Sequence, residues 1–252
     1  EASGVLPLMI GRAARLFDYL VEKEKTYVAQ LKPGYATDTQ DAHGAIVSGG
    51  GARATRAQLE AVLPRFIGDI AQIPPMYSAL KRDGQKLCDL ARQGIDVKVE
   101  PRPTQVYAID VLHENEDGSF ILQIRCGRGT YIRTLCNDIG EALGTKAHMG
   151  VLLRTQTGMF TLDEAHTIEE IDAAEDLTPL LVAMDKPLGH LPRLDVQPKA
   201  ERFVRNGNKL TRRELIGDIQ PGKPTRLYLN GQFCGIGRFE GENLKFDAML
   251  LE

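Results

Sequence analysis

The segment FILQIRCGRGTYIRTLCNDIGEALG, residues 120–144, predicts a strand, a tight turn and a helix in direct succession. Apolar and polar residues alternate over positions 120–125, as in a half-buried strand, and the glycine-bounded turn Gly127-Arg128-Gly129 follows. From Thr130, the expected N-cap, apolar residues recur at helical spacing until Gly144 ends the helix. The segment therefore predicts one packed strand–turn–helix unit.

This helix is expected to carry Tyr131 and Arg133 in its first turn. A helix N-terminus favours anions through its free N–H groups and its dipole, and an arginine there binds a carboxylate or phosphate with two N–H groups. Tyr131 adds an aromatic face and a hydroxyl. The pair suits an aromatic, anionic ligand such as a nucleotide; the alternative is a capped helix whose Arg133 pairs with a surface acid.

Strands and helices of mixed order flank this unit. Strands are expected at residues 26–31, 106–112 and 148–155, and helices at residues 10–22 and after the capping box Thr55-x-x-Gln58. Their order predicts a mixed α/β (α+β) domain whose central sheet is largely antiparallel.

Residues 72–103 differ in composition from the rest of the chain. Pro74-Pro75 opens this segment and Pro101-x-Pro103 closes it, and the residues between are basic and partly helical in pattern. Its bases include Lys81 and Arg92. We expect an insertion that stands off the core.

Residues 191–252 are predicted to form short strands separated by turns. Asn230-Gly231 lies between apolar strand residues and is typical of a two-residue hairpin. About 60 residues suffice for a small β-barrel, and the boundary is expected near residues 186–191. The chain is therefore predicted to divide into a domain of residues 1–188 and a domain of residues 189–252.

Charge is unevenly distributed along the chain, whose net charge is −3. Residues 163–176 hold seven acids and no Lys or Arg, whereas residues 199–213 hold six bases and one acid. Residues 121–135 carry three arginines and no acid. The clustered bases indicate a phosphate-binding surface, and the alternative is that they lie on solvated faces.

Composition excludes several classes of protein. No apolar run approaches the ~20 residues of a membrane span, and the short run at residues 5–10 lacks the basic lead-in of a signal peptide. The four cysteines have no CxxC spacing, so reduced thiols in a cytoplasmic protein are expected. No cluster of Cys, His and carboxylates has metal-ligand spacing, so no metal is expected.

Several local motifs follow one another along the chain. They are Glu1-Ala2-Ser3-Gly4-Val5-Leu6-Pro7, Lys25-Thr26-Tyr27, Thr37-Asp38-Thr39-x-Asp41-x-x-Gly44, Ile73-Pro74-Pro75-x-Tyr77-Ser78-Ala79-x-Lys81, Gly129-Thr130-Tyr131-Ile132-Arg133, Ala147-His148 and Arg154-Thr155-x-x-Gly158. In this order they resemble the TruB family of tRNA pseudouridine-55 synthases over the whole chain. The C-terminal part resembles a PUA-type RNA-binding barrel.

This resemblance implies an enzyme with the pseudouridine-synthase fold that acts on the T-arm of tRNA. It would isomerise uridine 55 of the T-loop by flipping the base out, breaking its C–N glycosidic bond and forming a C–C bond. That reaction needs neither oxidation nor hydrolysis, so no cofactor is expected, and the protein is expected to be a cytoplasmic monomer. The alternative is a non-catalytic tRNA-binding or tRNA-folding protein on the same scaffold.

The resemblance also implies roles for single residues. Tyr27 would stack on the flipped-out uracil and Leu152 would pack against it, where the residues alone indicate an ordinary strand tyrosine and a core leucine. Tyr131 would line the site and take a proton during the rearrangement. Arg133 would form an ion pair with the catalytic aspartate.

Substrate binding is assigned to four further residues. Lys81 and Arg92, in the insertion, would grip the T-loop together with Tyr77. Arg128, in the turn before the helix, is expected to contact the RNA as well. The alternative for the basic residues is that they serve solubility.

The nucleophile of the family is an aspartate that the resemblance places two residues before Glu1, outside this chain. Asp38 and Asp41 are expected to order their loop and not to act as nucleophiles. The sequence departs from the family pattern at Cys88, where an aromatic residue is expected, and at Leu153, where an arginine is common.

Overall fold

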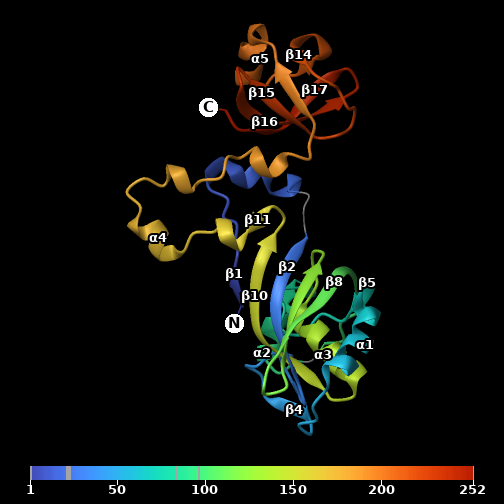
Figure 1. Ribbon diagram of the computed structural model, residues 1–252. Coiled ribbons are helices and arrows are strands. Elements are labelled where there is room, and N and C mark those ends of the chain that lie inside the picture. The colour runs from blue at the N-terminus through green and yellow to red at the C-terminus, as the bar shows by residue number, and fades with distance from the viewer. Residues whose placement is uncertain (1, 21–23, 83, 96, 252) are drawn as a thin grey trace. The chain divides into compact units, whose positions relative to one another are not determined.

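The chain folds into two compact units (Figure 1). The computed structural model describes residues 2–20, 24–82, 84–95 and 97–251. The first unit comprises Glu1–Leu6 and Lys23–Ala165, and the second comprises Pro7–Glu22 and His166–Glu252. The predicted domain boundary between residues 188 and 189 stays a prediction. Two segments that precede it, Pro7–Glu22 and residues 166–188, belong to the second unit.

A twisted sheet forms the centre of the first unit, and its strand order is β1-β10-β2-β9-β8-β5, with β11 paired to β10. Every pairing is antiparallel except that of β1 with β10. The largely antiparallel sheet predicted from the sequence is therefore confirmed. Its strands are β1 (Ala2–Gly4), β2 (Lys25–Pro33), β5 (Gly68–Gln72), β8 (Arg102–Glu114), β9 (Phe120–Cys126), β10 (Ala147–Thr157) and β11 (Phe160–Thr161).

Helices α1 (Arg56–Val62) and α3 (Ile132–Leu143) contribute to the core of this unit. α3 packs against β10 and β2, and α1 packs against α3. Alternate residues of β9 are buried and face the same core, as its sequence predicted. The described part of the unit also contains η2 (Leu63–Phe66), η3 (Leu162–Glu164) and the two-stranded sheet of β3 (Tyr35–Thr37) and β4 (Ile46–Gly49).

The N-terminus of α3 differs from the prediction by one residue. The helix begins at Ile132 with Tyr131 as its N-cap, and Thr130 is not the cap. The hydroxyl of Thr130 bonds instead to the Thr104 hydroxyl and to the carbonyl of Gly127, so it is not available to the helix. Gly144 ends the helix in the left-handed conformation at φ 72°, as predicted.

The segment between β5 and β8 leaves the sheet and returns to it at one place, because Gln72 and Arg102 are paired. It contains the hairpin of β6 (Lys81–Arg82) and β7 (Gln85–Lys86), and the short helix α2 (Leu87–Arg92). Leu87 and Leu90 are its buried apolar side chains. The predicted insertion is therefore present as a small substructure beside the sheet.

The second unit contains a six-stranded, barrel-like sheet in the order β13-β17-β16-β15-β12-β14. The predicted hairpin joins β15 to β16 through Asn230 and Gly231, whose φ angles are 51° and 79°. Its strands are β12 (Arg193–Val196), β13 (Leu210–Thr211), β14 (Leu215–Ile216), β15 (Thr225–Leu229), β16 (Gln232–Glu240) and β17 (Asn243–Met249).

An N-terminal segment packs against this sheet. The helix predicted at residues 10–22 is a 3-10 helix, η1 (Gly11–Tyr19), and positions 21 and 22 lie outside the described residues. Arg12 and Arg15 donate hydrogen bonds to the carbonyls of Leu250 and Met249, both at 2.8 Å. These contacts explain why residues near the N-terminus belong to the second unit.

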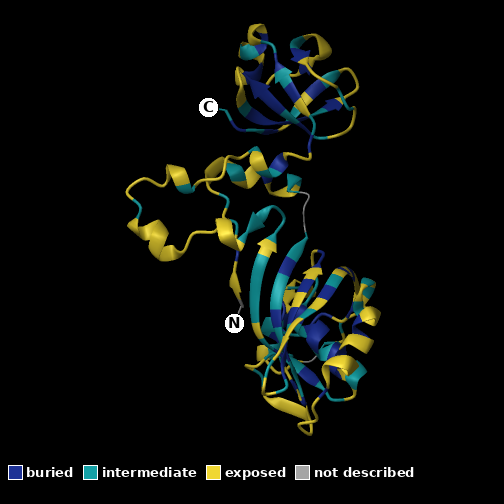
Figure 2. Ribbon diagram, in the orientation of Figure 1, coloured by how far each residue is buried: buried dark blue, intermediate teal, exposed yellow. Residues whose placement is uncertain are grey.

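Short helices make up the rest of the second unit. α4 (Ile168–Ala173) begins at the predicted capping box of Thr167 and Glu170, buries none of its residues and is exposed in Figure 2. The others are η4 (Thr178–Leu180), η5 (Lys186–Leu188), η6 (Pro198–Ala200), α5 (Glu201–Arg205) and η7 (Arg212–Glu214). In the described parts of the chain, no helix has the length and apolar character needed to cross a membrane.

Candidate active site

A cavity of about 310 Å³ opens in the first unit where the N-terminus of α3 meets β2 and β10. Four residues singled out from the sequence line it together: Tyr27, Tyr131, Arg133 and Leu152. The remaining lining residues are Asp41, Thr130, Ile132 and Met149. The cavity therefore combines aromatic and apolar walls with one arginine and one carboxylate.

The antiparallel pairing of β2 with β10 brings Tyr27 and Leu152 to the same cavity. Both side chains are partly buried and pack against the core of the unit. Burial raises the pKa of the Tyr27 hydroxyl, and the nearby Arg154 opposes this only in part. Tyr27 is therefore neutral at physiological pH and presents an uncharged ring to the cavity.

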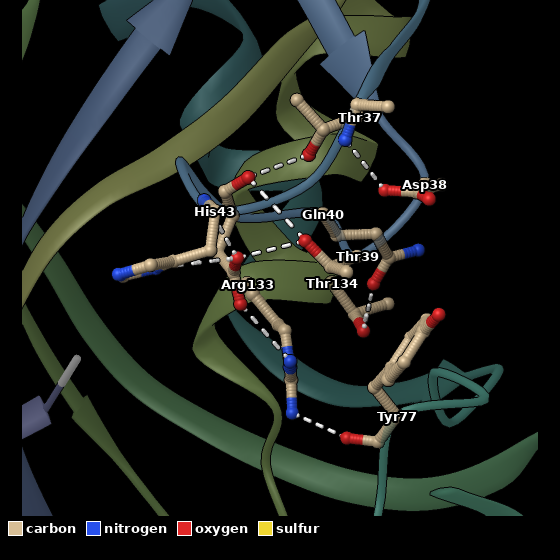
Figure 3. Close-up of polar contacts among 10 residues, drawn as sticks. Thr37, Asp38, Thr39, Gln40, His43, Tyr77, Arg133 and Thr134 are labelled. Carbon is tan, nitrogen blue, oxygen red and sulfur yellow. Dashed lines mark hydrogen bonds and ion pairs between the residues drawn. The ribbon is translucent and has the colours of Figure 1, made fainter. Parts of the chain in front are cut away.

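Arg133 is held from two directions (Figure 3). Its Nη1 lies 3.1 Å from Oδ2 of Asp41, and its Nη2 donates a hydrogen bond to the backbone carbonyl of Tyr77 at 2.6 Å. The side chains of Arg133 and Asp41 are 24% and 15% exposed. The ion pair is largely shielded from solvent, so each partner depends on the other for charge compensation.

The loop after β3 presents Asp41 to Arg133. Oδ1 of Asp41 accepts hydrogen bonds from the Thr39 hydroxyl at 2.7 Å and from the backbone N–H of His43 at 3.1 Å. Asp38 accepts one from the backbone N–H of Ala45. Both aspartates therefore bond within their loop, as predicted. The pairing of Asp41 with Arg133, 92 positions away, was not foreseen.

Burial alone would raise the pKa of the Asp41 carboxyl, but its bonds to Thr39 and His43 and the charge of Arg133 outweigh burial and lower it. A lowered pKa in the folded state stabilises the fold at pH above the unfolded value of about 3.9, and this contribution is lost as pH falls through the folded pKa. We expect Asp41→Asn to lower the free energy of unfolding near neutral pH, and this deficit to shrink in acid. Urea denaturation at several pH values measures it; a deficit that stays constant with pH would contradict the role of the carboxylate.

The backbone of Tyr131 is bonded to the side chain of Gln72, a residue to which the sequence assigned no role of its own. Its N–H donates to Oε1 of Gln72 at 3.0 Å, and Nε2 of Gln72 donates to its carbonyl at 3.3 Å. Thr130, which also lines the cavity, bonds to Thr104. Neither contact has a signal in the sequence, because their partners lie 59 and 26 positions away.

The other predicted contact residues do not line the cavity. Lys81 is exposed on β6, and Arg128 is exposed in the turn before α3. Arg92 is exposed and lies 3.3 Å from Asp89. Tyr77 is half-buried and approaches the site through its carbonyl. Contact of these residues with RNA stays a prediction.

Side chains suited to metal binding do not gather here. Within the described ranges, no group of three or more His, Cys, Asp or Glu side chains lies close enough to hold a metal ion. Cys88, one of the departures from the family pattern, is half-buried on α2, and its backbone N–H donates to the carbonyl of Ser78. Leu153, the other, is half-buried on β10 beside Leu152.

Comparison with known proteins assigns most of the chain to family models. Residues 1–132 match the TruB family pseudouridylate synthase N-terminal domain, and residues 133–188 match the tRNA pseudouridylate synthase B C-terminal domain. A curated relative from Alkaliphilus oremlandii, named tRNA pseudouridine synthase B, is 39% identical over 99% of this chain and 85% of its own length. One of the same name from Dechloromonas aromatica is 42% identical over 94% of this chain and 78% of its own.

Solved structures with the same fold include chains from two complexes. The chain aligns with one from an H/ACA RNP bound to a substrate RNA containing 2'-deoxyuridine, with a TM-score of 0.68 and 21% identity over 100% of this chain and 73% of that one. It aligns with one from a Cbf5-Nop10-Gar1 complex with a TM-score of 0.66 and 24% identity, over 97% of this chain and 72% of that one. At these identities the likeness shows the fold alone.

Proposed function

This chain belongs to the TruB family of tRNA pseudouridine synthases, and we propose that the uridine it isomerises is that of position 55 in the T-loop. The single observation that carries a catalytic site is the cavity that gathers Tyr27, Tyr131, Arg133 and Leu152. Conversion of a T-arm hairpin, with the modified position mapped by sequencing, tests the proposal. Pseudouridine formed only elsewhere in tRNA would contradict it.

The residues around the cavity suit the isomerisation. The bond from uracil N1 to the ribose must break, the base must turn, and the ribose must rejoin it through C5. Flipping the uridine out of a folded loop costs a few kcal/mol, which stacking on an aromatic ring offsets. Tyr27 provides that ring, Leu152 and Met149 provide apolar walls that exclude water, and Arg133 holds a carboxylate beside the base.

The nucleophile is proposed to be an aspartate that precedes Glu1. β1 runs parallel to β10 with Ala2 opposite Leu152 and Gly4 opposite Arg154. If β1 continued toward the N-terminus in this register, the residues before Glu1 would lie opposite the part of β10 that leads from Leu152 back to Met149. Both of these β10 residues line the cavity. A carboxylate there would meet Arg133, whose guanidinium carries five N–H groups and uses only some of them for Asp41 and Tyr77.

The protein is expected to bind a T-arm hairpin more tightly than an unstructured RNA of the same length. Lys81 and Arg92 are exposed in the insertion, and phosphates would compete with Asp89 for the guanidinium of Arg92. Affinity should fall steeply with salt, because phosphate contacts release counterions. Fluorescence anisotropy with both RNAs at several salt concentrations measures this, and equal affinities would contradict T-loop recognition.

Three further expectations, on the second unit, the cellular location and the oligomeric state, are also proposals. The bases of residues 199–213, in the second unit, would bind RNA phosphates. A cytoplasmic location fits the four cysteines, which are all free, three of them buried. A monomer is expected, and size-exclusion chromatography with light scattering tests it.

A further inference from the structure

A buried side chain holds the backbone of Tyr131 just before α3 begins. Gln72 is 2% exposed, and its amide accepts from the N–H of Tyr131 and donates to the carbonyl of the same residue, at 3.0 and 3.3 Å. This pattern of one donor and one acceptor is what a neighbouring strand offers. The glutamine side chain thus takes the place of a strand partner for this one residue.

The position of Tyr131 explains why such a partner is needed. Cys126 is the last residue of β9 that pairs with neighbouring strands, and α3 begins only at Ile132. Tyr131 lies between the two elements in an extended conformation, with φ −95° and ψ 106°, and no side-chain cap of its own. Without Gln72 the N–H of Tyr131 would lose its partner, whereas its carbonyl would keep the hydrogen bond from the N–H of Leu135. A partly buried N–H without a partner is unfavourable, so loss of the amide would favour a different backbone path here.

The backbone path of Tyr131 decides where its ring lies. The direction of the Cα–Cβ bond follows from φ and ψ, and Tyr131 lines the cavity together with Arg133. We propose that Gln72 is a positioning residue: it fixes the ring of Tyr131 in the cavity and so sets the rate of the chemical step, and not the affinity for RNA. This inference rests on the proposed function.

One short segment thus holds both Tyr131 and Arg133. Gln72 is the last residue of β5 and holds Tyr131, and five positions later Tyr77 accepts the hydrogen bond of Arg133. This segment opens the insertion to which T-loop binding is assigned. A glutamine is suited to the first task because its amide is both donor and acceptor, whereas an ionised glutamate only accepts.

The first test compares Gln72→Met with Gln30→Met as a matched control. Gln30 also has a hydrogen-bonded amide in this sheet, but its partner is the Ser119 hydroxyl at 2.9 Å, and it does not line the cavity. In a form that carries the proposed nucleophile before Glu1, single-turnover formation of pseudouridine should fall about 10- to 100-fold in Gln72→Met, as for a small misplacement of a reacting group. The Kd for T-arm RNA and the thermal unfolding midpoint should change no more than in the control.

The second test uses Gln72→Glu. Burial raises the pKa of a carboxyl group, and its protonated form again has one donor and one acceptor. The ratio of its rate to that of the unmodified enzyme should therefore rise as pH falls, whereas the ratio for Gln72→Met should stay flat. A merely structural role does not predict that difference, and parallel profiles for the two variants would overturn the proposal.

The third test measures a change in the surroundings of the Tyr131 ring and does not depend on enzyme activity. Residues 1–252 labelled with 3-fluorotyrosine contain seven tyrosines, and Tyr131→Phe identifies the signal of Tyr131 in the ¹⁹F spectrum. This signal should shift or broaden in Gln72→Met and stay in place in Gln30→Met. Absence of pseudouridine formation by an unmodified form that carries the proposed nucleophile before Glu1 would count against the proposed function alone, whereas an unchanged Tyr131 signal in Gln72→Met would overturn the positioning role.

Discussion

In a complete enzyme that includes the proposed nucleophile, Arg133→Ala is expected to lower pseudouridine formation about 100- to 1,000-fold, the range found when one charge-stabilising group is removed from an active site. The substitution leaves Asp41 without its cation, and it removes the group proposed to hold the nucleophile. Breaking a buried ion pair costs about 3–5 kcal/mol, and the remaining exposure of both side chains places the expected loss at the lower end. Steady-state kinetics on a T-arm RNA and urea denaturation measure the two effects.

Arg133→Lys separates the charge of this residue from its geometry. An ammonium group keeps the charge but cannot bind Asp41 and the Tyr77 carbonyl with the spacing of a planar guanidinium. We expect stability to recover more than activity does. Near-normal turnover in the lysine variant would show that activity does not require the guanidinium to bind both Asp41 and the Tyr77 carbonyl.

A protein of residues 1–252 alone is expected to bind T-arm RNA and to form no detectable pseudouridine. The surfaces assigned to RNA lie within these residues, whereas the proposed nucleophile precedes them. Loss of a nucleophile costs on the order of a million-fold in rate, and even about 1 Å of misplacement costs about 100-fold, so another acid is a poor substitute. Asp41 is bound to Arg133, and Asp38 to the backbone of its own loop.

The comparison needs a form extended at the N-terminus, with an aspartate two residues before Glu1, and the same form with that aspartate changed to asparagine. Release of tritium from C5-labelled uridine in T-arm RNA reports turnover for all three proteins. Only the extended form with the aspartate should be active. Robust release by residues 1–252 would place the nucleophile within them, and Asp38 would be the first residue to substitute.

Local patterns predicted the elements that position the site. The alternation in β9, the helical spacing after it and Gly144 predicted the strand, turn and helix, because strand and helix periods and caps are properties of neighbouring residues. The same argument placed Thr130 one residue too early as the cap. Local spacing cannot show that the Thr130 hydroxyl bonds to Thr104 on another strand.

Resemblance to a family predicted site residues that the periodicity of the sequence could not indicate. It singled out Tyr27 and Leu152, whose local patterns indicate ordinary strand residues, and the structure places both at one cavity with Tyr131 and Arg133. It assigned Asp41 to loop order alone. The bonds of Asp41 to Thr39 and His43 agree with that assignment, but its second oxygen pairs with Arg133.

The sequence by itself determined the strand–turn–helix unit of β9 and α3, the hairpin at Asn230-Gly231, and the family and its chemistry. Only the tertiary structure decided which groups meet: Asp41 with Arg133 across 92 positions, and Gln72 with Tyr131 across 59. Such contacts depend on how strands pair and how α3 packs against the sheet. A side chain carries no local mark of the distant backbone group that it will bond, so these partners became visible only once the chain was folded.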